Sequence, residues 1–104
     1  YPECARIVRE ATGATRVHVF DHTLRGPHLP RDPVMRVHND YTDLSAAQRI
    51  RDLLPDEAEA LLRGRYAYIN VWRPIANPVF DTPLAFCDAR SFADDDLVLC
   101  VLYG

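Results

Sequence analysis

Apolar and polar side chains alternate along residues 15–20, 34–40 and 65–73. Because successive side chains of a β-strand point to opposite faces, this period of two predicts strands with chemically different faces. A shorter strand is expected at residues 84–87. The continuous apolar run at residues 97–103 is typical of a strand buried on both faces. The pattern therefore predicts several short strands.

Helical patterns precede and interrupt these strands. Residues 2–10 predict a helix that has a proline in its first turn and that stops at Gly13. A capping-box sequence beginning at Ser45 predicts the start of a second helix, which Pro55 ends. A third helix is expected to follow Pro55 and to close at Gly64. The sequence thus predicts an N-terminal helix and a helical insert.

Composition limits the chain to one small domain, residues 1–104, of which 48% are hydrophobic. The net charge of −3 comes from 12 basic and 15 acidic residues without a basic stripe, which argues against nucleic acid or an anionic membrane as a partner. No apolar run is long enough to predict a membrane span. Three cysteines without metal-site spacing favour a reducing, cytoplasmic setting over a disulfide framework.

His38 and Asp40 are the first candidates for chemistry. In an extended segment, residues two apart point to the same side, so the imidazole and the carboxylate converge. Each can place a donor atom roughly 2.0–2.2 Å from one divalent metal. A second histidine would complete a 2-His-1-carboxylate facial triad, the site of non-haem Fe(II) oxygenases. The alternative is a solvated or structural pair with no metal.

The strand predicted at residues 65–73 carries Tyr66, Tyr68, Asn70 and Trp72 on one face. Large side chains with two hydroxyls and an amide can line a pocket and supply a few directed hydrogen bonds. They can equally form a core face whose polar tips bind backbone groups. Both interpretations stay open on the pattern alone.

Several motifs together resemble one family. They are Val37-His38-Asn39-Asp40-Tyr41-Thr42, the run from Ser45 to Pro55, Asn70-Val71-Trp72-Arg73-Pro74-Ile75, and the flanking segments near residues 12–25 and 83–91. In these the chain is similar to the iron- and 2-oxoglutarate-dependent oxygenase-like family that is named for a cephamycin 7-alpha-methoxylation component. That family also includes fungal hydroxylase/desaturase enzymes of secondary metabolism. The resemblance covers about residues 1 to 92.

The resemblance implies a fold and a function. The fold is α+β, a partial double-stranded β-helix (jelly roll) with the N-terminal helix and a helical insert after the His-x-Asp motif. The function is hydroxylation or desaturation of a small organic substrate, with Fe(II) as the metal and 2-oxoglutarate as the cosubstrate. The site residues it implies are His38 and Asp40 as metal ligands and catalytic residues, Asn70, Trp72 and Arg73 for cofactor binding, and Tyr41 and Tyr68 for the substrate pocket.

The third metal ligand has no candidate downstream of the motif, since no histidine follows His38. Family members carry the distal histidine in a second half, so the chain is expected to be a fragment of a larger oxygenase domain. The alternative is a catalytically incomplete jelly-roll remnant that serves as a small-molecule binding module. A further alternative is that two copies share ligands, with His18, His22 or His28 serving across an interface; the sequence leaves the oligomeric state open.

Overall fold

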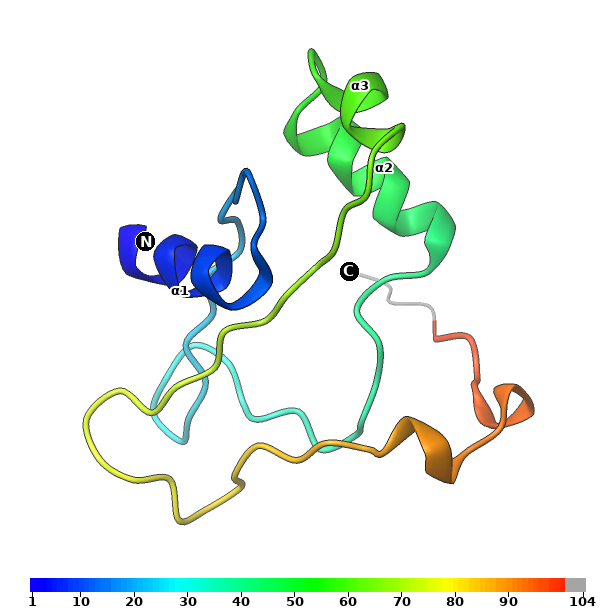
Figure 1. Cartoon of the computed structure of the whole chain (residues 1–104). Coiled ribbons are helices and arrows are strands. Elements are labelled where there is room, and N and C mark those ends of the chain that lie inside the picture. Colours follow the sequence, from blue (N-terminus) through cyan, green and yellow to red (C-terminus); the bar gives the residue numbers. More distant parts are fainter. Residues whose placement is uncertain (101–104) are drawn as a thin grey trace.

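The computed structural model describes residues 1–100 as helices joined by long extended segments (Figure 1). The α-helices are α1 (Pro2–Thr12), α2 (Asp43–Leu53) and α3 (Ala58–Leu62), and the 3₁₀ turns η1 (Ala89–Ser91) and η2 (Asp94–Asp96) follow them. Helices α2 and α3 pack on each other, while α1 lies apart from them and the extended segments run between and below. The helices therefore occupy two separate corners of the molecule.

Helix α1 begins and ends where the sequence predicts. Pro2 lies in the first turn, where the N–H that proline lacks would have no partner within the helix. Gly13 follows the last turn with a φ of 73°, the left-handed conformation that favours glycine. Its N–H donates to the Arg9 carbonyl at 2.9 Å. These local signals confirm the predicted N-terminal helix.

Helix α2 starts one turn earlier than the capping box predicted at Ser45. Thr42 is the N-cap, and its side chain accepts from the Ser45 N–H at 3.1 Å while the Ser45 hydroxyl accepts from the Thr42 N–H at 2.8 Å. Ser45 is thus the third helical residue and completes a capping box in place of the usual Glu or Gln. The helix ends at Leu53, just before the residue that precedes Pro55, because a residue before proline disfavours the helical conformation.

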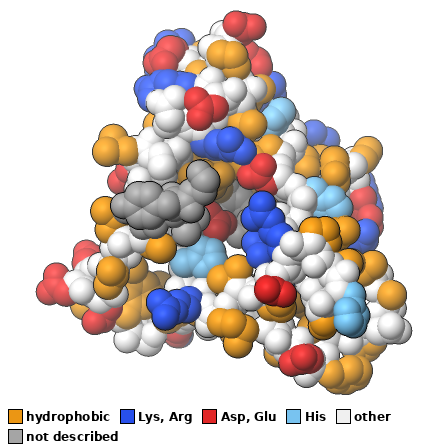
Figure 2. Space-filling model, turned by 180° about the vertical axis from the view of Figure 1, so that it is seen from behind, with side chains coloured by type: hydrophobic (Ala, Val, Ile, Leu, Met, Phe, Trp, Pro, Cys, Tyr) orange, Lys and Arg blue, Asp and Glu red, His pale blue; other side chains and the backbone are white. Residues whose placement is uncertain are grey.

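Among residues 1–100, the buried apolar side chains lie on α2 and α3. Ala46 on α2 and Ala58 on α3 are buried, and Arg51 pairs with Glu59 at 3.0 Å between the two helices. Many large apolar side chains elsewhere are exposed. On the face shown in Figure 2, apolar side chains lie scattered among charged ones. The core within the described part of the chain is therefore small.

The predicted jelly roll is wrong for the part of the chain that the structure describes. Residues 1–100 contain no strand, and the one β-bridge joins Arg25 to Arg31 within a loop. The four stretches predicted as strands at residues 15–20, 34–40, 65–73 and 84–87 form no ladder with one another. An alternating pattern reports two unlike faces, but a strand also needs a neighbour for its backbone hydrogen bonds.

The apolar run predicted as a buried strand at residues 97–103 lies partly outside the described residues. Its described portion is not a strand, and Leu97, Val98 and Leu99 are exposed there. The buried strand is therefore not found in residues 97–100.

Charged side chains join the extended segment after α1 to the α2–α3 pair. The Arg16 guanidinium donates two hydrogen bonds to the Glu57 carboxylate, of which Nη2 to Oε2 is 2.9 Å. Nearby, Arg49 on α2 pairs with Asp21 at 3.1 Å. Exposed ion pairs of this kind contribute little to stability because solvent screens them. The two ion pairs therefore influence where the segment after α1 lies more than they stabilise the fold.

We expect Thr42→Ala to weaken the start of α2. Losing an N-cap hydroxyl costs about 1 kcal/mol, which corresponds to a roughly fivefold larger equilibrium constant for opening of the first turn. Amide hydrogen exchange of residues 44–47 measures this opening. Thr15→Ala, at an exposed threonine outside the helices, is the matched control. Unchanged protection in the Thr42 variant would contradict the capping role.

The Arg16–Glu57 pair predicts a pH effect. Hydrogen bonds from the Arg16 guanidinium hold the pKa of the Glu57 carboxyl below its ordinary value. The pair therefore stabilises the fold above the unfolded-state pKa of Glu57, about 4.3, and loses that contribution as the pH falls through the lower folded-state pKa. A ¹³C NMR titration of Glu57 should show its midpoint rise in Arg16→Gln and stay in place in Arg9→Gln. An equal midpoint in both variants would refute the pairing.

Candidate metal-binding site

His38 and Asp40 lie together on the extended segment that leads into α2. The distance from His38 Nε2 to Asp40 Oδ1 is 3.3 Å, and about half of each side chain is exposed. This is the convergence that the spacing of two residues predicts for an extended chain. It requires no neighbouring strand, because both groups come from the same short segment.

The other nitrogen of His38 fixes which ring atom faces Asp40. His38 Nδ1 lies 2.8 Å from the backbone carbonyl of Arg36. A carbonyl oxygen only accepts hydrogen bonds, so Nδ1 carries the proton and donates it. In the neutral ring Nε2 then presents a lone pair to the Asp40 carboxylate. A divalent metal between them would bind both groups.

A divalent metal fits this donor set. Two atoms that each lie about 2.1 Å from one metal, at a right angle, are about 3.0 Å apart. The 3.3 Å between His38 Nε2 and Asp40 Oδ1 is close to that value. An imidazole with its Nδ1–H bound to a backbone carbonyl is also the usual form of a histidine ligand. Within the part of the chain that the structure describes, no group of three His, Cys, Asp or Glu side chains comes together that could hold a metal.

Asn70 reaches the same carboxylate from a distant part of the chain. Its side-chain Nδ2 donates to Asp40 Oδ2 at 2.9 Å. Asp40 Oδ1 faces His38, so the two oxygens of one carboxylate have different partners. Of the three residues that the resemblance implies for cofactor binding, Asn70 is the one that contacts the His38–Asp40 pair.

Trp72 and Arg73 do not join that pair in the described structure. About half of the Trp72 side chain is exposed. The Arg73 guanidinium lies 3.5 Å from the Glu3 carboxylate on α1. Cofactor binding by these two residues stays a prediction.

Three aromatic rings surround the ring of Tyr68. The rings of Tyr41 and Tyr68 stack with centroids 4.4 Å apart, and Phe20 meets the Tyr68 ring edge-on at 5.8 Å. Tyr66 meets it at 6.4 Å. The Tyr68 hydroxyl donates to the Ala46 carbonyl on α2 at 2.7 Å. Partial burial, with Tyr41 and Tyr66 adding a smaller effect, raises the pKa of Tyr68, so its hydroxyl stays a donor at neutral pH.

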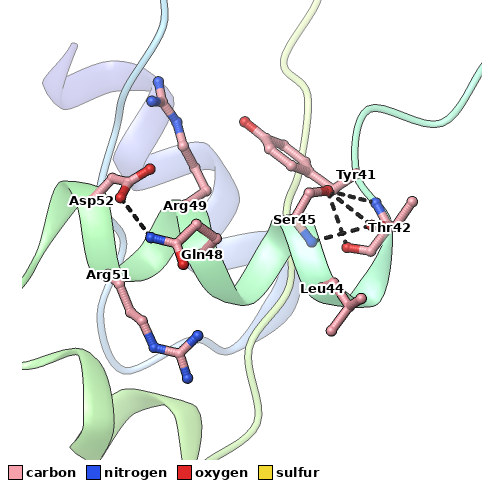
Figure 3. A pocket seen from close by; sticks show the side chains of 8 residues that line it. All are labelled: Tyr41, Thr42, Leu44, Ser45, Gln48, Arg49, Arg51 and Asp52. Carbon is pink, nitrogen blue, oxygen red and sulfur yellow. Dashed lines mark hydrogen bonds between the residues drawn. The ribbon is translucent and has the colours of Figure 1, made fainter. Parts of the chain in front are cut away.

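A shallow hollow of about 680 Å³ lies beside this cluster, along the first three turns of α2 (Figure 3). Its lining residues are Tyr41, Thr42, Leu44, Ser45, Gln48, Arg49, Arg51 and Asp52. Tyr41, which the resemblance implies for the substrate pocket, lines this hollow. Tyr68 instead packs against Tyr41 and α2. Substrate contact by either tyrosine stays a prediction.

Sequence reasoning missed Arg49, which the pattern assigned to a solvated helix face. Its guanidinium lies 5.4 Å from the centre of the Phe20 ring and pairs with Asp21, and its side chain lines the hollow. Asp21 lies 28 positions away in the sequence. No local signal marks such a contact.

Comparison with known proteins places the chain in a family. A family model described as oxidoreductase/YMDC permease-like domain matches residues 1–103. The chain belongs to this family. Of the helices in residues 1–100, none combines the length and the apolarity needed to cross a membrane. No solved structure matches the chain.

Several curated proteins that are similar to this chain have oxygenase or hydroxylase names. The chain is 35% identical to the Fe(II)/2-oxoglutarate-dependent dioxygenase nvfI of Aspergillus novofumigatus, over 93% of this chain and 36% of that protein. It is 36% identical to the hydroxylase/desaturase CTB9 of Cercospora beticola, over 93% of this chain and 35% of that protein. It is 30% identical to the alpha-ketoglutarate-dependent dioxygenase phiK of a fungal species, over 94% of this chain and 39% of that protein.

These matches confirm the resemblance predicted from the motifs. The chain spans about a third of the length of the curated relatives it matches. The relatives' names therefore describe proteins about three times as long as this chain.

Tyr68→Phe tests the anchor between residues 65–73 and α2. Removing the hydroxyl leaves the Ala46 carbonyl without this donor, and we expect a loss of about 1 kcal/mol in the free energy of unfolding. Urea unfolding followed by Trp72 fluorescence measures it. Tyr66→Phe, at a neighbouring and more exposed tyrosine, is the control. If both variants unfold alike, the Tyr68 hydroxyl is not an anchor.

Proposed function

We propose that this chain supplies the His-x-Asp part of a non-haem Fe(II)/2-oxoglutarate-dependent oxidoreductase that hydroxylates or desaturates a small organic, secondary-metabolite-like molecule. The observation that carries the proposal is the His38–Asp40 pair, whose Nε2 and Oδ1 lie 3.3 Å apart, with the His38 Nδ1 held by the Arg36 carbonyl. The names of relatives at 30–36% identity support it.

His38 and Asp40 are the metal ligands in this proposal, and they are its catalytic residues. Bound Fe(II) and 2-oxoglutarate supply the dioxygen-dependent oxidation of a C–H bond. The chain's own groups would hold the metal and orient the ligand ring. The Arg36 carbonyl keeps the proton on His38 Nδ1, so that Nε2 is available as a ligand. A facial triad needs one more histidine. We assign that ligand to residues other than 1–100 of the working enzyme, since no third donor joins the pair within them.

The cofactor and substrate residues of the proposal follow the family resemblance. Asn70, Trp72 and Arg73 are assigned to the cofactor region, and Tyr41 and Tyr68 to the substrate side. The hollow along α2 supports the substrate assignment, because Tyr41 lines it next to the metal pair. We place the enzyme in the cytoplasm, since Cys4, Cys87 and Cys100 are free thiols, as a reducing compartment favours.

The test is an anaerobic titration of the chain with Fe(II) and then 2-oxoglutarate. We expect the weak visible charge-transfer band of the Fe(II) chelate in the parent chain and in His28→Ala, whose histidine lies in an exposed loop. We expect no band in His38→Ala, because the variant lacks one of the two ligands that residues 1–100 provide.

Two outcomes would overturn the proposal. Tight, stoichiometric Fe(II) binding by His38→Ala would show that the ligands lie elsewhere. Metal binding by the parent with no response to 2-oxoglutarate would favour the non-catalytic alternative, a binding module for a metal or a small molecule.

A further inference from the structure

The hydrogen bond from Asn70 makes the two oxygens of Asp40 unequal. Oδ2 accepts from Asn70 Nδ2 at 2.9 Å, while Oδ1 lies 3.3 Å from His38 Nε2. A carboxylate can bind a metal through one oxygen or through both. With Oδ2 held by an N–H donor, Oδ1 is the oxygen left to meet a metal at His38.

The difference between the two oxygens of Asp40 affects how many positions on the metal stay open. A facial triad provides three protein donors and leaves three positions open on a six-coordinate metal. A carboxylate that binds through both oxygens would occupy one of the open positions. A donor that engages Oδ2 therefore keeps the carboxylate monodentate and the position free.

Asn70 is well placed to act on Asp40 because its segment is tied to the same part of the chain. Tyr68 lies two residues before Asn70, and its ring stacks on Tyr41, the residue after Asp40. The Tyr68 hydroxyl also bonds to Ala46 on α2. Two adjacent side-chain pairs, Tyr41 with Tyr68 and Asp40 with Asn70, thus join the two segments in a fixed register.

We propose that Asn70 is a positioning residue for the metal site: its side-chain amide holds Asp40 Oδ2 and thereby presents Oδ1 alone to the metal. This inference rests on the proposed function and assigns Asn70 to the ligand Asp40 instead of to the cosubstrate. About half of the Asp40 side chain is exposed, so without this bond the carboxylate is free to turn. Partners of this kind change metal affinity by about 10- to 100-fold.

The test compares Asn70→Leu, which has nearly the same size and no donor, with Asn77→Leu in an exposed loop. Zn(II) is the probe, because it binds the same donors and does not oxidise. We expect the Kd for Zn(II) to rise 10- to 100-fold in Asn70→Leu and to stay unchanged in Asn77→Leu.

The infrared difference spectrum between metal-loaded and metal-free chain provides a readout that a purely structural role would not move. The splitting between the two carboxylate stretches is wide for one-oxygen binding and narrows for two-oxygen binding. We expect a wide splitting in the parent and a narrower one in Asn70→Leu. Asp40→Ala, which loses the band, identifies it.

The outcomes separate this inference from the proposed function. A parent chain without any Asp40 band would overturn the proposed function and this inference with it. An Asp40 band in the parent, with the same splitting and the same Kd in Asn70→Leu, would overturn the inference alone.

A measurement on the unchanged chain covers the case in which Asn70→Leu does not fold. NMR should show slower solvent exchange of the Asn70 side-chain amide than of the Asn77 amide when Zn(II) is bound. Equal exchange of the two amides would also overturn the inference.

Discussion

The stacked rings of Tyr41 and Tyr68 hold together the parts of the chain that form the candidate metal site. Tyr41 directly follows Asp40, and Tyr68 directs its hydroxyl to α2 while Asn70, two residues on, reaches Asp40. In residues 1–100 no β-ladder joins these segments, so the side chains do what backbone hydrogen bonds do in a sheet. An aromatic pair contributes about 0.5–1.5 kcal/mol beyond the area it buries.

Local features were predictable from the sequence because they depend on neighbours a few residues away. Pro2, Gly13 and Pro55 set helix limits through backbone conformation, and the structure follows them. The convergence of His38 and Asp40 is local as well, since the spacing of two residues holds for any extended segment. The start of α2 differs from the prediction by one turn, because Thr42 and not Ser45 is its N-cap.

Features that join distant segments were not predictable in the same way. The alternation in residues 34–40 predicts a strand with one apolar face. Met35 and Val37 on that face are exposed, however, and no ladder forms in the described chain. The bond from Asn70 to Asp40 spans 30 positions, and that from Arg49 to Asp21 spans 28. Nothing in one sequence states which of the many polar side chains at such separations will meet.

This division between local and distant contacts would make the proposed metal site depend on folding in a particular way. His38 and Asp40, the proposed ligands, keep their spacing wherever residues 36–40 are extended, so weak metal binding by the two would need little of the fold. The Asn70 contact exists only when residues 65–73 dock on Tyr41 and α2. Whatever affinity that contact adds is therefore available only to the docked state, and a bound metal must stabilise the docking by the same free energy. A metal bound at the proposed site and the Tyr41–Tyr68 stack would thus favour the same arrangement of the chain.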